Sequence, residues 1–448
     1  LSTVGVGMLK FRCTPSRGFF FILAAAFSLH GLGLEASAAE KKPEYDQAIL
    51  DEIGVKLDQL YESGVIPNYV VDIRRAGEVI YFRARGKTEL GGDVSVSEDT
   101  IYVLASMSKP IVSTGVLKLI ETGKLSLEDP LSKFFPQFES MLVAPNGDLD
   151  IPFEEADKPI TIRHLLTHTS GFTYPPQVLG VGEVAQQYND IGLMWGAASS
   201  LEEFADILSQ IPLVAHPGET FNYSVSIDIL GAIIEQITGQ RLGDYLHETV
   251  FEPLGMVNTA FYVPDEKRIL LPRVYGPATP NNPAPFIRDD PIKWQISEAK
   301  YFGQGFEQIG RKGKYESGGG GLFSSSRDFL QYSQMVANYG ELKGVRILKP
   351  ETAALHFRDL MPDLGLEAFR ANFGDAASYM KFGGGLGIKV EEDGSDRVDY
   401  YFWGGAANTF FWIDGEDQSV GAFFTHIAPP RYNMTDQIEE IVDRARIK

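Results

Sequence analysis

The stretch IYVLASMSKP, residues 101–110, sets a serine and a lysine three positions apart where an apolar segment passes into a helical pattern. The apolar spacing that follows continues to Gly123 and predicts an amphipathic helix that opens at the serine. Residues i and i+3 share one face of a helix, so Lys109 can hydrogen-bond Ser106 and accept its proton if burial depletes the ammonium. A serine here can also be a plain helix cap, so the stretch needs support from elsewhere in the chain.

Two further motifs supply that support. The Ser-x-x-Lys pair is weak evidence alone, because the chain contains it at 106–109, 297–300 and 378–381. The motif Tyr223-Ser224-Val225 precedes an apolar helical pattern, and Trp403-Gly404-Gly405 stands at the end of a predicted strand. Either motif by itself has an ordinary explanation, since tyrosines pack in cores and glycine pairs mark turns.

Taken in order, the three motifs resemble those of the serine β-lactamase and penicillin-binding-protein superfamily, whose class A members carry Ser-x-x-Lys, a second polar motif and Lys-Thr-Gly. The resemblance covers nearly all of the chain after residue 38. It implies an α+β fold, with an antiparallel sheet flanked by helices and a mostly helical lobe. Four class C-like segments carry it most specifically: Thr161 to Gly171, Pro217-Gly218 with Phe221 to Leu230, Pro253 to Met256, and Gly318 to Ser324.

The resemblance also implies catalytic roles. Ser106 would attack the substrate, Lys109 and Tyr223 would share proton transfer, and the backbone N–H groups of Ser106 and Ala406 would form an oxyanion hole. Two preorganised donors can each contribute about 2.7 to 4 kcal/mol to the transition state. Which of Lys109 and Tyr223 is the base stays open, and no cofactor is expected.

Three motif positions depart from the lactamase pattern. Val225 stands in place of asparagine and Trp403 in place of lysine, and Gly404 replaces threonine. Tryptophan supplies no cation for the carboxylate that β-lactams carry. These forms look like family VIII carboxylesterases, which implies hydrolysis of short-chain esters, with Val225 and Trp403-Gly404-Gly405 in the substrate-binding site. The alternatives are a β-lactamase or D-Ala-D-Ala carboxypeptidase, a linear-amide hydrolase or acyltransferase, and a protein that keeps the fold without catalysis.

Hydrophobic periodicity gives the same architecture independently. A helix is expected over Tyr45 to Ser63, followed by paired strands over Tyr69 to Arg85 around Ala76-Gly77. We expect a sheet lobe from about 45–105 and 300–448, and a helical lobe over about 106–299. The last predicted elements are strands at Phe382 to Val390, Val398 to Trp403, Thr409 to Ile413 and Val420 to His426, and a helix at Thr435 to Ala445.

The first 38 residues have the layout of a secretory signal peptide. Basic residues precede the apolar run Phe19 to Leu29, and Ala36-Ser37-Ala38 fits a cleavage site. We therefore expect export to the periplasm or outside the cell, without a stable membrane anchor. The one cysteine, Cys13, lies inside this segment, which excludes disulfides and thiolate chemistry from the mature protein.

Charge and missing motifs exclude other functions. Removing residues 1–38 moves the net charge from −20 to −22, because that segment holds three basic residues and one acidic residue. Nucleic acid is therefore a poor partner, and a small-molecule ester, β-lactam or amide is the expected one. His164 and His168 have i,i+4 spacing but lack a metalloprotease signature, so no metal site is expected. The chain also lacks the Gly-x-Ser-x-Gly elbow of α/β-hydrolases.

Overall fold

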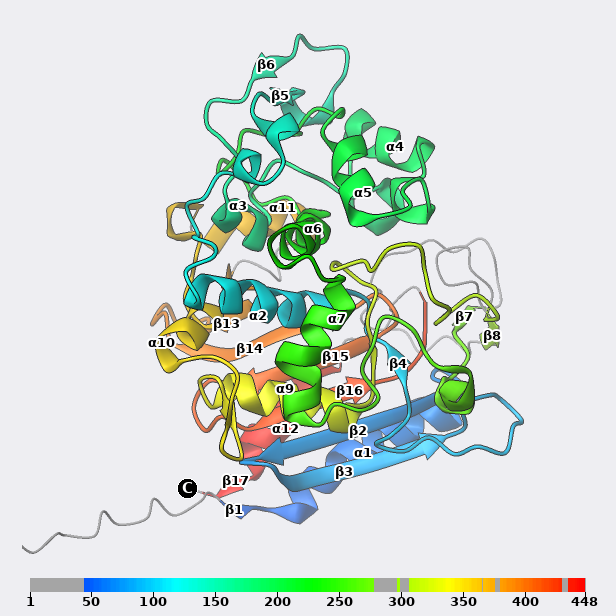
Figure 1. Cartoon of the computed structure of the whole chain (residues 1–448). Helices are drawn as coiled ribbons and strands as arrows, with labels where there is room; N and C mark the ends of the chain where they lie inside the picture. Colours follow the sequence, from blue (N-terminus) through cyan, green and yellow to red (C-terminus); the bar gives the residue numbers. More distant parts are fainter. Residues whose placement is uncertain are drawn as a thin grey trace, which may run out of the picture. The chain divides into compact units, whose positions relative to one another are not determined.

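A seven-stranded antiparallel sheet built from both ends of the chain forms the framework of the fold (Figure 1). The computed structural model describes residues 44–277, 296–298, 306–364, 366–374, 379–428 and 434–447. The sheet order is β12-β13-β14-β15-β16-β2-β3, so the predicted union of the two chain ends is confirmed. Its strands are β2 (Asn68–Arg75), β3 (Glu78–Gly86), β12 (Met380–Phe382), β13 (Gly387–Val390), β14 (Val398–Gly405), β15 (Thr409–Asp414) and β16 (Val420–Phe424).

Turn geometry accounts for two hairpins of the sheet. Ala76 and Gly77 join β2 to β3 with φ of 51° and 82°, the left-handed pair that suits a tight hairpin. The single strand expected over Phe382 to Val390 was wrong, because β12 and β13 pair with each other across an intervening turn. Gly383 in that turn has no room for a side chain, since a Cβ would lie 2.1 Å from the carbonyl oxygen of His356.

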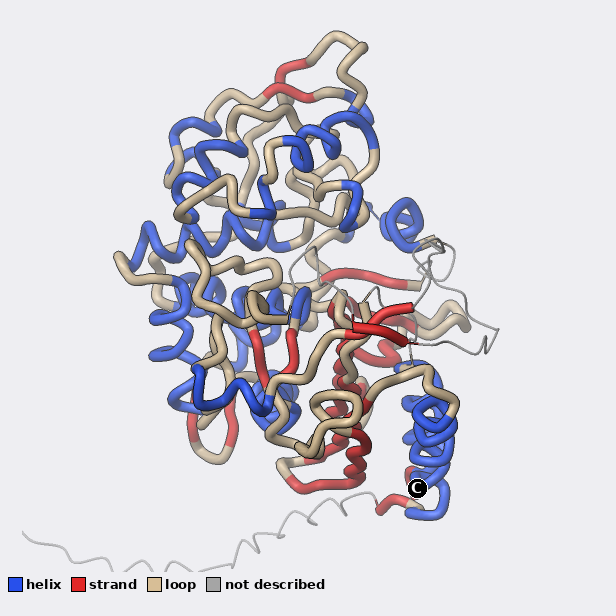
Figure 2. The backbone as a smooth tube through the Cα atoms, turned by 90° about the vertical axis from the view of Figure 1, so that its right-hand side faces the viewer, coloured by secondary structure: helices blue, strands red, loops and turns tan. Residues whose placement is uncertain are grey.

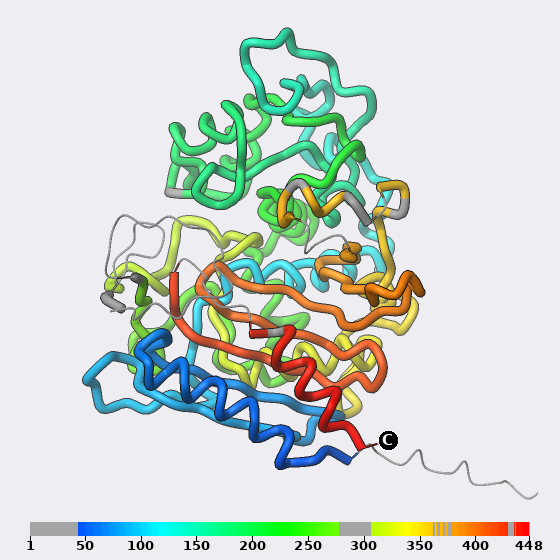
Figure 3. The backbone as a smooth tube through the Cα atoms, turned by 180° about the vertical axis from the view of Figure 1, so that it is seen from behind, coloured from blue at the N-terminus to red at the C-terminus, as the bar shows by residue number. Residues whose placement is uncertain are grey.

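Two helices from opposite ends of the chain cover one face of the sheet. Helices α1 (Gln47–Glu62) and α12 (Thr435–Ala445) lie together across the strands when the molecule is seen from behind (Figure 3). Both match their predicted positions. The Asp46 carboxylate caps α1 by accepting hydrogen bonds from the N–H groups of Ala48 and Ile49. Apolar side chains from both helices pack on this face of the sheet: Leu50, Ile53, Leu57, Ile438, Ile441 and Val442.

Helix α2 (Ser108–Glu121) lies on the other side of the sheet and is buried on all sides from Ser108 to Leu117. The expected helix is present, but its predicted amphipathic character was wrong, because α6 (Ser226–Thr238) and further helices pack against α2 and leave it no solvent face over that length. Figure 2 shows the strands of the sheet gathered in the lower half, with helices and loops above them. The remaining α-helices are α3 (Ile162–Leu166), α4 (Gly182–Asp190), α5 (Leu201–Leu208), α7 (Leu242–Leu246), α8 (Glu252–Leu254), α9 (Ser326–Ala337), α10 (Pro350–Ala353) and α11 (Arg370–Phe373).

Short antiparallel strand pairs join the loops to this framework. They are β1 (Glu44–Tyr45) with β17 (Arg446–Ile447), β4 (Tyr102–Val103) with β9 (Phe323–Ser324), β5 (Leu142–Val143) with β6 (Glu154–Glu155), β7 (Tyr275–Pro277) with β8 (Ile296–Glu298), and β10 (Glu341–Leu342) with β11 (Val345–Arg346). The predicted signal peptide, including Cys13, lies outside the described residues. Within the described part of the chain, no helix is long and apolar enough to cross a membrane.

Candidate active site

Ser106 lies in a single 3-10 turn, Ala105–Met107, between β4 and the start of α2. The α-helix begins two residues later than the serine, at Ser108. Ala105 adopts φ of 47°, a left-handed conformation that costs energy for a residue with a side chain. Ser106 is partly exposed between two buried neighbours, so a substrate can reach its hydroxyl.

Lys109 is the buried cation of this site. Its side chain is almost fully enclosed, at 1% exposure, and its Nζ donates to Ser106 Oγ at 3.2 Å and to the carbonyl oxygen of Gly319 at 2.6 Å. Burial lowers the pKa of Lys109 to about 7, and the charge of Asp228 raises it in part. At neutral pH a substantial fraction of this amine is uncharged and can accept a proton from Ser106.

Tyr223 and Trp403 complete the group around Ser106. The Tyr223 ring centre lies 4.6 Å from Lys109 Nζ, and the Trp403 indole N–H donates to the Tyr223 hydroxyl at 3.4 Å. Burial raises the pKa of Tyr223, whereas its hydrogen bonds to Ser106 and Trp403 lower it. The three predicted catalytic side chains thus converge at one place from two separate parts of the sequence, and Trp403 joins them from a third.

Asp228 belongs to this site although no sequence motif identified it. It lies in the first turn of α6, fully buried, and its Oδ1 accepts from the Ser317 hydroxyl at 2.5 Å and from the Gly319 N–H at 3.2 Å. Gly319 thus bonds Asp228 through its N–H and Lys109 through its carbonyl oxygen. The available signal was an acidic residue between apolar ones, Ile227 and Ile229, in a helix that is otherwise core.

The glycine run 318–321 approaches the site as closely as the sequence suggested. A Cβ on Gly318 would lie 2.6 Å from the Ile227 carbonyl oxygen, and one on Gly319 would lie 2.5 Å from Asp228 Oδ2. Real Cβ atoms do not come so near to other heavy atoms, so a side chain at either position would displace α6 or the glycine run. The absence of side chains lets this backbone reach Lys109.

The third motif positions the backbone beside Ser106. A Cβ on Gly405 would lie 2.3 Å from the Leu104 carbonyl oxygen, so the end of β14 packs directly against the chain that leads into the nucleophile turn. Ala406 follows at once and is partly exposed. A Cβ on Gly404 would meet the Phe410 ring at 2.6 Å. This packing holds the residue before Ala406 against the segment that leads into Ser106. The oxyanion role of the Ala406 N–H stays a prediction.

Val225 does not take the place expected for it. Its side chain is fully buried in the main core and exposes no surface to a substrate. Its carbonyl oxygen accepts the N–H of Asp228 at the start of α6. The predicted substrate contact at Val225 is therefore wrong, because α6 turns this residue inward.

Comparison with known proteins agrees with this geometry. The Beta-lactamase family matches residues 56–444. The chain belongs to the Beta-lactamase family. Esterase EstB of Burkholderia gladioli is 31% identical over 312 residues, which cover 67% of this chain and 73% of the relative. Lovastatin esterase of Penicillium rubens is 28% identical over 80% of this chain and 88% of its own length.

A solved structure shares the fold. It is EstCE1, a hydrolase with promiscuous acyltransferase activity, which superposes with a TM-score of 0.71 at 27% identity and covers 89% of this chain and 99% of its own. The predicted α+β architecture is confirmed by this match and by the sheet described above. Together, the family and its relatives establish that the chain is a serine hydrolase.

An aromatic wall that no sequence motif indicated borders the site of this Beta-lactamase family member. The Phe373 ring centre lies 6.1 Å from that of Tyr223 and 6.3 Å from that of Trp403. Asn372 holds the segment in place, because its Oδ1 accepts the Tyr223 N–H at 3.2 Å and its Nδ2 donates to the Phe221 carbonyl oxygen at 2.9 Å. Helix α11 thereby adds apolar surface next to the Tyr223 ring.

His164 in α3 and His168 just after it have separate hydrogen-bond partners. His164 Nδ1 accepts the Thr161 N–H at 3.2 Å, and His168 Nδ1 accepts the Ser224 N–H at 3.2 Å. The His168 ring also packs against Tyr223, with ring centres 4.7 Å apart. His168 therefore helps to hold Tyr223 and Ser224 in place. Of the two other Ser-x-x-Lys pairs, Lys300 and Ser378 lie outside the described residues.

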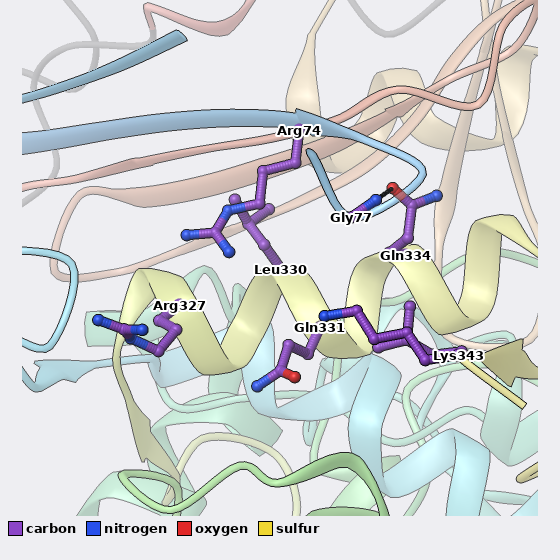
Figure 4. Close-up of a pocket in the computed structure, with 8 residues that line it drawn as sticks. Arg74, Gly77, Arg327, Leu330, Gln331, Gln334 and Lys343 are labelled. Carbon is purple, nitrogen blue, oxygen red and sulfur yellow. Dashed lines mark hydrogen bonds between the residues drawn. The ribbon is translucent and has the colours of Figure 1, made fainter. Parts of the chain in front are cut away.

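A cavity of about 200 Å³ lies elsewhere, between α9 and the β2–β3 hairpin (Figure 4). Its two arginines are already engaged, because Arg74 pairs with Asp72 and Glu98 at 2.8 Å each and Arg327 pairs with Glu98 at 2.6 Å. Ser106, Lys109 and Tyr223 do not line it. The lining residues are Arg74, Gly77, Arg327, Leu330, Gln331, Gln334, Leu342 and Lys343.

Proposed function

We propose that this protein is a carboxylesterase that hydrolyses small, uncharged esters through an acyl-enzyme on Ser106. The observation that carries the proposal is the indole of Trp403, which stands where the lactamase pattern has a lysine and donates its N–H to Tyr223. No cation is therefore presented at this position to a substrate carboxylate. The relatives named as esterases support the same interpretation.

In the first half of the reaction, Ser106 Oγ attacks the ester carbonyl and loses its proton. Lys109 is the acceptor we favour, because its Nζ lies 3.2 Å from that oxygen and burial lowers its pKa to about 7. Tyr223 stays protonated, since burial raises its pKa, and it can donate to the leaving alkoxide. The N–H groups of Ser106 and Ala406 would receive the oxyanion.

In the second half, water attacks the acyl-enzyme and the same groups act in reverse. Lys109 returns a proton to Tyr223, which gave its own to the leaving alcohol, so the acyl-enzyme holds a neutral Lys109. This amine takes a proton from the attacking water, and Ser106 regains a proton as it leaves. Asp228 touches no reacting atom, so it acts as a positioning residue. It holds the Gly319 peptide that accepts a hydrogen bond from Lys109, and its charge raises the pKa of that lysine against the larger, lowering effect of burial.

The aromatic wall suggests the character of the acyl or alcohol group. Tyr223, Trp403 and Phe373 offer ring surface next to the nucleophile, and such surface favours apolar groups. An apolar alcohol held there would compete with water for the acyl-enzyme. Acyl transfer to an added alcohol is therefore the second candidate activity, and the related EstCE1 is itself a hydrolase with promiscuous acyltransferase activity.

The test is a substrate panel on the purified full chain and on Ser106→Ala. Nitrophenyl acetate, nitrophenyl butyrate and a chromogenic cephalosporin are compared by kcat/KM, and an added alcohol tests for transfer. We expect the two esters to be turned over faster than the cephalosporin, with all turnover lost in Ser106→Ala. Faster cephalosporin turnover would assign the protein to the β-lactamases instead. A fluorophosphonate probe that labels wild type no more than Ser106→Ala would show a protein without a working nucleophile.

A further inference from the structure

Three carboxylates meet behind the sheet, away from Ser106. Asp414 is the last residue of β15, and Glu439 and Asp443 lie four residues apart on α12 and so share one face of that helix. One oxygen from each carboxylate lies within 4.8 Å of the other two. In the strand register, Asp414 pairs opposite Tyr400, whereas Gly405 at the other end of β14 faces the nucleophile turn. The cluster is thus separate from the active site, and two of its members belong to α12, the helix drawn in red in Figure 3.

Glu439 is the member of this cluster whose carboxylate lacks a partner among the described residues. Its side chain is buried, at 3% exposure, and within the described part of the chain neither of its carboxylate oxygens has a hydrogen-bond partner. Burial raises the pKa of Glu439 well above its usual value, and the charges of Asp414, Asp443 and Asp399 raise it further. An enclosed carboxylate without any partner is costly, so proteins seldom retain one without a use.

Arg446 balances only part of the charge. It pairs with Asp414, with Asp443 at 3.1 Å and with Asp417 at 3.3 Å. Among the ion pairs of the described residues, none joins Arg446 to Glu439. The cluster therefore holds more negative charge than its arginine can neutralise, and the uncompensated group is the most deeply buried one.

We propose that Asp414, Glu439 and Asp443 bind a divalent cation, with calcium as the best fit. Calcium takes six to eight oxygen ligands at about 2.3 to 2.6 Å, so two ligands on opposite sides can be about 5 Å apart. Magnesium requires about 2.0 to 2.1 Å, and its opposite ligands lie nearer to 4 Å. Calcium accepts several carboxylates in a flexible arrangement, whereas magnesium usually binds through one or two, so a set of three carboxylates suits the larger ion. Asp443 is about half exposed and gives the ion a path from solvent, while water completes the coordination.

The cation would join strand β15 of the sheet to the C-terminal helix α12. Asp414 belongs to the sheet and the two other ligands belong to the C-terminal helix. Binding should therefore raise the thermal stability of the native protein, because the unfolded chain has no such site. Ester hydrolysis at Ser106 should stay unchanged, which separates this proposal from the function proposed above.

The test uses the full chain after removal of metal ions with EDTA. Calcium binding is measured by calorimetry, and the melting temperature is followed with millimolar CaCl₂ or MgCl₂. Glu439→Gln keeps the side-chain shape but removes the charge, and Glu440→Gln makes the same change at an exposed neighbour on α12. We expect calcium to raise the melting temperature of wild type and Glu440→Gln alike. Glu439→Gln should weaken calcium binding at least tenfold.

Asp443→Asn provides a second variant in case Glu439→Gln does not fold. It changes a partly exposed ligand and should also weaken calcium binding. Two results would overturn the proposal: no calcium binding by wild type at millimolar concentration, or equal binding by wild type and both ligand variants. In either case Glu439 would be a buried neutral acid. A larger stabilisation by magnesium than by calcium would overturn the choice of ion.

Discussion

Asp228 and Glu439 are both buried carboxylates on helices, yet their surroundings differ. Asp228 accepts hydrogen bonds from Ser317 and Gly319 and lies close enough to Lys109 to raise the pKa of that lysine. Glu439 has acidic neighbours and, among the described residues, no hydrogen-bond partner. The difference shows that burial alone does not say what a carboxylate does. A carboxylate beside a cationic side chain can shift the pKa of that side chain. A buried carboxylate among other acids can instead bind a cation from solution.

The largest expected effect separates the two regions by activity. Ser106→Ala should lower kcat for nitrophenyl acetate by about 10⁴-fold or more, because the nucleophile of a coupled catalytic group is removed. Glu439→Gln should stay within about twofold of wild type, since it lies away from the reacting atoms. Initial rates on both variants test this contrast. A comparable loss of kcat in both variants would mean that the acidic cluster takes part in the reaction.

The next largest effect concerns Tyr223, the proposed proton donor in the active site. Tyr223→Phe removes the phenol but keeps the ring, and we expect kcat to fall by about 10² to 10⁴-fold, the range of general acid–base catalysis. Trp403→Phe removes one hydrogen bond to that phenol and should cost about fivefold. Steady-state kinetics on the two variants measure the loss of kcat in each. An equal loss in both would contradict this expectation, because the indole would then contribute as much as the phenol.

A smaller effect tests the pairing of Asp228 with Lys109 directly. Because Lys109 must be neutral to accept a proton, kcat/KM should fall below a midpoint near pH 7, the pKa to which burial lowers it. The Asp228 charge raises that pKa, so Asp228→Asn should move the midpoint to lower pH. The loss of kcat/KM at pH 8 should be about tenfold or less.

The control for this change is Asp244→Asn, an exposed acid on α7, which should leave the pH profile in place. Full pH profiles of wild type and both variants decide the outcome. An upward shift in Asp228→Asn would mean that the carboxylate acts through structure and not through its charge on the lysine.

The smallest expected effect is that of Glu439 on the stability of the protein. The raised pKa of Glu439 means that the folded protein binds more protons than the unfolded chain above pH 4.5, so stability should fall as pH rises toward neutral. Without metal, Glu439→Gln should remove this slope and raise the free energy of unfolding at pH 7 by about 1 to 2 kcal/mol. Urea denaturation at pH 5 and pH 7 measures it. A destabilised variant at pH 7 would indicate a favourable contact for the Glu439 charge.

Local patterns in the sequence predicted much of the fold. The extents of α1 and α12 follow from apolar spacing, and the β2–β3 turn follows from Ala76-Gly77. The motifs of Ser106, Lys109 and Tyr223 also led to the family, because each combines a reactive side chain with a characteristic spacing. The pattern failed where glycines at 383–385 broke one expected strand into two, and where α2 proved to be buried on all sides.

The sequence by itself determined the family, the enzyme class and the side chains that meet at Ser106, because motif chemistry is local to a few residues. Only the tertiary structure decided which buried groups act together. Asp228 reaches Lys109 through the Gly319 backbone, and Glu439 meets Asp414 across the interface of α12 and the sheet. Val225 turned inward for the same reason. Burial and electrostatic coupling depend on distances between segments far apart in the chain, and no local spacing encodes those distances.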